Sequence, residues 1–90
     1  MKIYFKNSFI KDINKLPEPV KTEARDICFS EFPKLNSLND FQGHNIKKLS
    51  GFAFFYRIKL GNYRIGFKKT NGDIIFMRVL HRKDIYRFFP

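Results

Sequence analysis

The 90-residue chain is long enough for a single small domain over residues 1–90. Its 18 lysines and arginines outnumber its 8 acidic residues, and the net charge of +10 favours nucleic acid or an acidic protein segment over a membrane as partner. A single cysteine excludes an intrachain disulfide and a cysteine-based zinc site. No apolar run reaches transmembrane length and no secretory pattern opens the chain, so we expect a soluble cytoplasmic protein.

The N-terminal half predicts a strand followed by two helices. Residues Lys2–Phe5 alternate between polar and apolar side chains, which is typical of a strand. Ser8 is expected to cap a short helix with apolar residues at helical spacing, which Pro17 ends. Pro19 suits the first turn of a second amphipathic helix, which Pro33 closes.

The C-terminal half predicts an antiparallel sheet after a loop over residues 34–45, in which His44 is expected at the surface. The turn signals Gly61-Asn62 and Asn71-Gly72 join three strands into a meander. The four expected strands of this half are Ile46–Leu49, Phe52–Leu60, Tyr63–Lys69 and Ile74–Leu80. We therefore predict an α+β fold with two N-terminal helices packed on a mostly antiparallel, twisted sheet of about four strands.

The first hairpin brings two cations face to face. With Gly61-Asn62 as the turn, Lys59 lies opposite Arg64, and like charges in that position are destabilising. An anion between the two side chains would remove this cost, whereas the plain alternative is a solvated sheet face. The helix-covered face is expected to carry Tyr56, Ile58, Ile65, Phe67 and Phe76. The open face is expected to carry Arg57, Lys59, Arg64 and Lys68.

The C-terminal run adds cations, a phenol and a histidine. Tyr86 either packs the last turn against the core or offers a ring on which a base can stack. His81 is either an edge residue or a general acid or base. Neither histidine has a cysteine or acidic neighbour at ligand spacing, so we expect no metal and no cofactor.

Three segments resemble the RelE/ParE toxin superfamily, and its RelE-like branch in particular. They are Lys48-Leu49-Ser50-Gly51, the run from Tyr56 to Ile65 with its Tyr-Arg-x-Lys-x-Gly-x-Tyr-Arg pattern, and the run from Val79 to Tyr86 with its His-Arg pair. The order of the predicted elements agrees with this RelE-like, microbial ribonuclease-like fold. The resemblance covers nearly the whole chain, and the last 45 residues are its specific part.

The resemblance implies a metal-independent endonuclease that cuts mRNA in the ribosomal decoding site, by attack of a ribose 2′-hydroxyl on the adjacent phosphate. Lys59 would act at the 2′-oxygen, Arg64 at the scissile phosphate and Arg82 at the leaving 5′-oxygen. Tyr86 would stack on or orient the nucleotide. Arg57 stands where RelE proteins often have lysine, and it would clamp phosphate because arginine holds its proton too tightly to serve as a base.

Further basic residues are expected to contact RNA, and the family implies partners. The expected RNA contacts are Lys48, Lys68, His81, Lys83 and Arg87, with His81 as a proton relay. The resemblance also implies the ribosome and a cognate antitoxin with an acidic or amphipathic segment, which would form a hetero-oligomer with this chain. Two alternatives stay open: a ParE-like gyrase inhibitor without nuclease activity, and a non-catalytic nucleic-acid-binding module.

Overall fold

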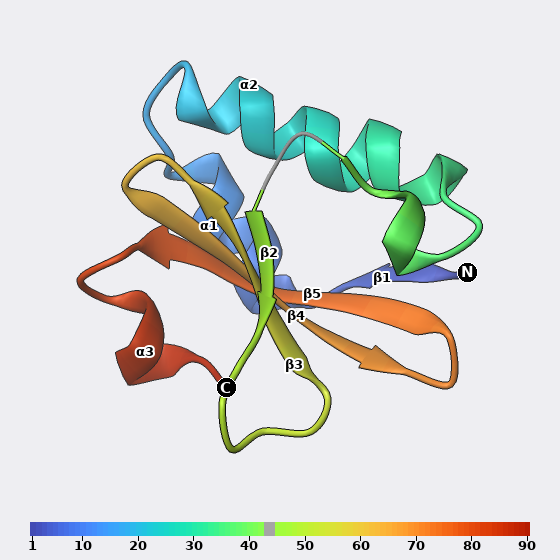
Figure 1. The fold of residues 1–90 in the computed structure, drawn as a ribbon. Helices are drawn as coiled ribbons and strands as arrows, with labels where there is room; N and C mark the ends of the chain where they lie inside the picture. Colours follow the sequence, from blue (N-terminus) through green and yellow to red (C-terminus); the bar gives the residue numbers. More distant parts are fainter. Residues whose placement is uncertain (43–44) are drawn as a thin grey trace.

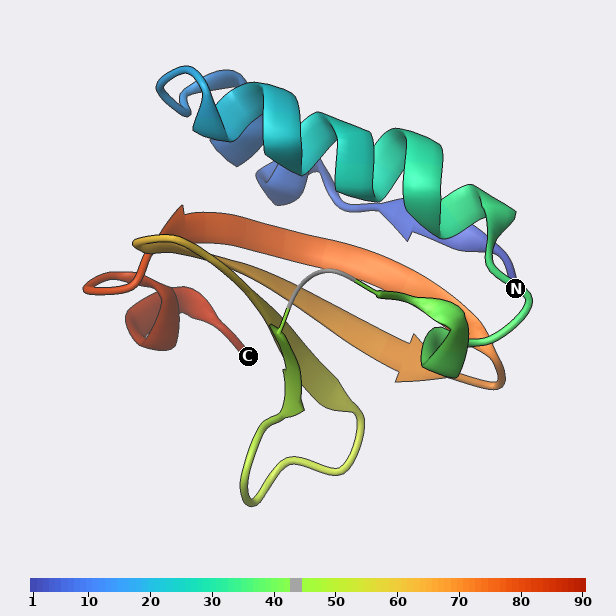
Figure 2. The same cartoon turned by 45° about the horizontal axis from the view of Figure 1, so that its top comes forward.

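The computed structural model describes residues 1–42 and 45–90, so the expectation for His44 lies outside the described residues. A single twisted sheet carries α1 and α2 on one face and α3 on the other (Figures 1 and 2). The elements are β1 (Ile3–Phe5), α1 (Asn7–Asn14), α2 (Val20–Arg25), β2 (Asn45–Lys48), β3 (Phe55–Leu60), β4 (Tyr63–Thr70), β5 (Asp73–His81) and α3 (Ile85–Phe88). The predicted α+β class is confirmed. None of the helices in the described residues is long and apolar enough to span a bilayer.

The sheet has five strands in the order β1-β5-β4-β3-β2, where about four were predicted. Strands β2 to β5 are antiparallel, and β1 adds to β5 in parallel, with Ile3 beside Ile74. Strand β3 begins at Phe55, three residues later than predicted, because a turn with Gly51 at φ +81° precedes it. The hairpin register is confirmed, since Lys59 lies opposite Arg64.

The two N-terminal helices begin and end differently from the prediction. Helix α1 starts at Asn7, and the Ser8 hydroxyl donates to the Met77 carbonyl at 2.7 Å, so the expected helix cap by Ser8 is wrong. Helix α2 continues through a π-helical turn over Asp26–Glu31 into a 3₁₀ turn over Phe32–Lys34. Pro33 therefore lies inside the last turn, near its start, where a missing N–H is tolerated.

Aromatic rings fill the space between the helices and the sheet. Phe67 lies at the centre, with ring centroids 5.7 Å from both Phe32 and Phe76. Four of the five residues predicted for the covered face are completely buried, and the fifth, Tyr56, is half-buried and stacks on Phe67 at 5.4 Å. Cys28 is buried in the same core, and burial together with the nearby charge of Glu31 raises the pKa of its thiol.

Helix α1 supplies side-chain hydrogen bonds to β5 where β1 ends. The carboxylate of Asp12, 8% exposed, accepts from Arg78 Nε at 2.7 Å, from Arg78 NH2 at 3.0 Å and from the Val79 amide at 3.1 Å. The hydrogen bond to Asp12 is the main reason why the pKa of Arg78 is raised. This two-pronged pair ties α1 to the sheet, and it was not predicted.

The second face of the sheet is only partly open, because the C-terminal segment (residues 82–90) lies against it on the side away from α1 and α2 (Figure 2). Ile85 is fully buried and Phe89 is 2% exposed. The Phe89 ring rests on Gly66, where an added Cβ would lie 2.6 Å from its Cδ2 atom. The Phe55 ring also contacts the Phe89 ring, and their centroids are 5.7 Å apart. Two apolar residues at helical spacing therefore hold this segment against the sheet.

We expect Asp12→Ala to lower the free energy of unfolding by about 3 kcal/mol, since it leaves the Arg78 guanidinium and the Val79 amide without their partner. The control is Asp84→Ala, whose ion pair with Arg87 is exposed and 3.9 Å long and should cost less than about 1 kcal/mol. Urea unfolding of both variants measures the difference. Equal costs would show that the buried carboxylate has no special role in stability.

We expect Gly66→Ala to cost roughly 1–3 kcal/mol of stability, because the new methyl group would displace the Phe89 ring. Gly66 is not among the glycines with positive φ, so the backbone itself tolerates alanine. A double-mutant cycle with Phe89→Leu tests the cause. In the smaller Phe89→Leu background the cost of Gly66→Ala should shrink, whereas strictly additive costs would contradict the contact.

Candidate functional site

Cations oppose each other across two strand pairs on the face that carries α3. Lys59 of β3 lies opposite Arg64 of β4, and Lys47 of β2 lies opposite Arg57 of β3. Lys68 follows on the same face of β4, with its ammonium 5.7 Å from the centre of the Phe55 ring. We call these five residues the basic face. Since like charges in cross-strand positions are destabilising, this arrangement favours a bound anion.

The turn of the hairpin anchors two arginines at one end of the basic face. Arg64 NH1 donates to the carbonyls of Gly61 and Tyr63 at 2.8 and 2.9 Å. The Arg82 amide donates to the Asn62 carbonyl at 2.7 Å. The side chain of Arg64 and the backbone of Arg82 are therefore held at the same turn before any ligand arrives.

Arg57 has an unsatisfied donor. Its NH1 atom is buried and has no hydrogen-bond partner in the described part of the chain. The residue lies opposite Gly66, on which the Phe89 ring rests. An unpaired buried guanidinium donor is costly, and a hydrogen-bond acceptor such as a phosphate oxygen would remove that cost.

The C-terminal segment presents its polar residues outward. Tyr86 is 57% exposed, and Ile85 and Phe89 make the packing contacts that a buried tyrosine would have made. Lys83 is exposed at the start of the segment, and Arg87 is exposed beside Asp84. Tyr86 is therefore free to contact a ligand.

His81 lies away from the basic face. In the register of β4 and β5 it is opposite Tyr63, and the two rings meet edge to face at 5.3 Å. Tyr63 alternates with Arg64, so the pair lies on the helix side of the sheet. The His81 Nδ1 atom accepts a hydrogen bond from the Lys83 amide at 3.1 Å. The structure thus does not bring His81 together with Lys59 and Arg64.

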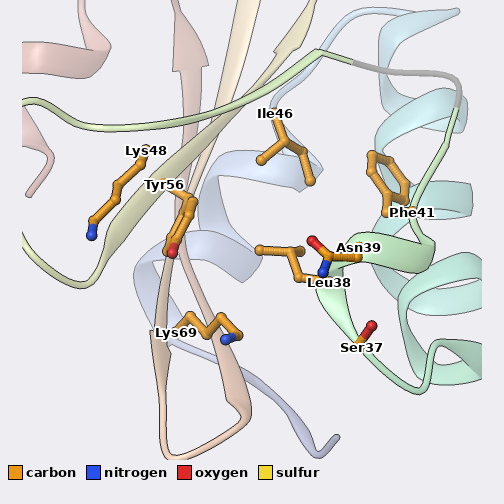
Figure 3. A pocket seen from close by; sticks show the side chains of 8 residues that line it. All are labelled: Ser37, Leu38, Asn39, Phe41, Ile46, Lys48, Tyr56 and Lys69. Carbon is orange, nitrogen blue, oxygen red and sulfur yellow. The ribbon is translucent and has the colours of Figure 1, made fainter.

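Lys48 also lies on the helix side, because it is opposite Tyr56. It lines a groove of about 510 Å³ in which strand residues face a loop (Figure 3). The strand side is formed by Ile46, Lys48, Tyr56 and Lys69, and the loop side by Ser37, Leu38, Asn39 and Phe41. The neighbouring Lys47 is the lysine of β2 that shares the basic face.

Lys47 and the C-terminal packing were missed at the level of sequence, although signals for both exist. Pairing the short strand with Phe52–Leu60 in an antiparallel register would have placed Lys47 or Lys48 beside Arg57, but only the exact register separates the two. Ile85 and Phe89 are four residues apart, which is the spacing of a buried helical stripe. Among residues 1–42 and 45–90, no three His, Cys, Asp or Glu side chains gather as metal ligands would.

Comparison with known proteins identifies the family of this chain. The family model described as "ParE toxin of type II toxin-antitoxin system, parDE" matches residues 3–86. The curated protein "Toxin RelE3" of Methanocaldococcus jannaschii is 43% identical over 90 residues, which is all of both chains.

Solved structures extend the comparison. A chain of the RelB–RelE antitoxin–toxin complex from Methanococcus jannaschii superposes with a TM-score of 0.81 at 40% identity, covering 97% of this chain and 99% of that chain. A chain of the intact E. coli RelBE complex shares the fold, with a TM-score of 0.60 at 20% identity, and covers 87% and 92% of the two chains. The present chain therefore belongs to the RelE/ParE superfamily of toxins from type II toxin–antitoxin systems, within its RelE-like branch.

Proposed function

We propose that this toxin is a ribosome-dependent endonuclease that cuts mRNA in the decoding site and thereby stops translation in the cytoplasm. The observation that carries the proposal is the pair of like-charge contacts, Lys59 with Arg64 and Lys47 with Arg57, on one face of a rigid sheet. Cations held in place before the reaction stabilise the negative charge that develops on a phosphate in the transition state. These side chains supply the positive charge at the phosphate without a metal ion.

The reaction is an attack of the ribose 2′-oxygen on the adjacent phosphorus. The bond from phosphorus to the 2′-oxygen forms while the bond to the 5′-oxygen breaks, which leaves a cyclic phosphate and a 5′-hydroxyl. Lys59 acts at the 2′-oxygen, Arg64 binds the scissile phosphate and Arg82 stabilises the leaving 5′-oxygen. Arg57 clamps a phosphate oxygen through its unsatisfied NH1, and the exposed Tyr86 orients the nucleotide.

The remaining RNA contacts follow from the faces of the sheet. We place Lys47, Lys68, Lys83 and Arg87 around the message, because they lie on the basic face or at the surface of the C-terminal segment. Lys47 takes the position first assigned to Lys48, which is on the other face. Because His81 is on the helix side, water takes the proton of the 2′-hydroxyl and supplies the proton that the leaving 5′-oxygen gains.

A cognate antitoxin is the proposed protein partner. The similar archaeal and E. coli structures are described as RelB–RelE antitoxin–toxin complexes, which supports such a partner here. An acidic or amphipathic antitoxin segment would neutralise the basic face, either by covering it or by displacing residues 82–90. The net charge of +10 favours this partner as well.

A gyrase inhibitor of the ParE type is the second candidate, because the matching family model is described as a ParE toxin. The full set of cations and the exposed Tyr86 favour the nuclease instead. Gyrase-dependent DNA breaks without message cleavage would decide for the ParE activity.

We expect Arg64→Ala to lower the rate of message cleavage on programmed ribosomes by about 10²–10³-fold, since it removes charge stabilisation from the transition state. Arg82→Ala should also slow the reaction. Arg25→Ala on α2 removes the same charge far from the basic face and should keep the parent rate. Thermal midpoints close to that of the parent would show that these variants are folded.

The outcome that contradicts the catalytic assignment is simple. If folded Arg64→Ala and Arg82→Ala cut message as fast as Arg25→Ala, the basic face is not the active site. If the parent protein never cuts message but inhibits gyrase, the second candidate replaces the first.

We expect RNA affinity to fall steeply with salt, because each neutralised phosphate of a single strand contributes a log–log slope of about −0.7. Lys59→Ala should make the slope shallower by one such step, whereas the exposed Lys34→Ala on the opposite side of the sheet should leave it unchanged. Titrations at several salt concentrations measure both slopes. A flat dependence for the parent would exclude the basic face as the RNA-binding surface.

A further inference from the structure

A groove of about 340 Å³ runs between two segments that are far apart in the sequence. The loop after β2 contributes Leu49, Ser50 and Phe52, and the C-terminal segment contributes Tyr86, Phe89 and Pro90. In Figure 1 the C-terminus lies beside the start of this loop. The volume is at the small end of the range of ligand sites, which is about 300–1,000 Å³.

Two aromatic side chains on the border of this groove are turned toward solvent. Phe52 is 48% exposed and Tyr86 is 57% exposed, and they come from different sides of the groove. Single exposed aromatic residues are ordinary on protein surfaces. Two of them at one groove, with the buried Phe89 as its floor, form a surface that suits a flat aromatic ligand.

No acidic or basic side chain lines the groove, whereas a cation lies beside it. The ring of Phe55 contacts both Phe52, at 6.3 Å, and Phe89, at 5.7 Å, and the Lys68 ammonium lies over that same ring. An aromatic ligand attached to a phosphate would therefore find its ring site and its charge site next to each other, whereas an acidic peptide would find no cation within the groove.

We propose that this groove is a subsite for one unpaired nucleobase of single-stranded RNA, held against Phe52 and Tyr86 while the neighbouring phosphates lie on the basic face. The subsite rests on the proposed function and adds the nucleotide contact that Phe52 makes. Every base has a face that can stack, so the subsite accepts any base. The Ser50 hydroxyl can donate to or accept from the edge of that base.

The test uses the folded full-length protein and a short single-stranded RNA with 2-aminopurine at one position. Methyl groups on its 2′-oxygens prevent cleavage. The protein contains no tryptophan, so the fluorescent base can be excited selectively. Stacking on the protein should quench its emission, and titration of the quenching gives the affinity without ribosomes.

Phe52→Ala should weaken binding about 5- to 150-fold, as expected for the loss of a base–aromatic stack. Phe54→Ala is the matched control, because Phe54 belongs to the same loop and is 54% exposed but does not line the groove. It should stay within about twofold of the parent. Phe52→Tyr should retain the quenching, and thermal midpoints check that each variant folds.

Three results would overturn the subsite: equal affinities for Phe52→Ala and Phe54→Ala, no quenching by the parent, or equally tight binding when the probe base is replaced by an abasic site. Quenching that depends on Phe52 supports the subsite even if the protein leaves message on ribosomes uncut, which would overturn the proposed function alone. Cleavage by the parent with equal affinities of the two alanine variants would overturn the subsite alone.

Discussion

The contact between Phe89 and Gly66 determines what the second face of the sheet can do. Only a glycine leaves room for the ring, and the ring in turn holds residues 82–90 against β4. Together with the buried Ile85, this contact keeps the four residues of α3 in place, because so short a helix is not stable alone. An apolar contact on the central strand β4 therefore positions Tyr86, Lys83 and Arg87 of the C-terminal segment.

The same contact covers the middle of the second face at Gly66, and the cations of the basic face lie around it. The hairpin turn at Gly61 and Asn62 places Arg64 and Arg82 at one end, and the loop after β2 places Phe52 beside the C-terminal segment. The opposed cations cost stability. The aromatic core and the Asp12 carboxylate on the other side of the sheet offset that cost. A rigid sheet can therefore hold like charges close together, which a flexible loop would separate.

Local patterns predicted most of the fold and part of the site. The period-two alternation around Gly61-Asn62 was sufficient to place Lys59 opposite Arg64, because a two-residue turn fixes the register of a hairpin. Contacts between segments far apart in the sequence could not be predicted from such patterns. The pairing of β1 with β5, the exact register of Lys47 and Lys48, and the reach of Arg78 to Asp12 all depend on tertiary packing. The cover of Phe89 over Gly66 went unpredicted because a glycine within a strand does not say which residue approaches it.

Adjacent lysines on opposite faces offer the most direct test of where the message binds. A photoreactive side chain can replace Lys47, on the basic face, or Lys48, in the groove on the helix side. The two positions are adjacent in β2 and both exposed, so they differ mainly in the face of the sheet that carries the side chain. Irradiation on programmed ribosomes should cross-link the message to position 47 and not to position 48. Cross-links from position 48 alone would contradict the account and move the RNA to the other side of the sheet.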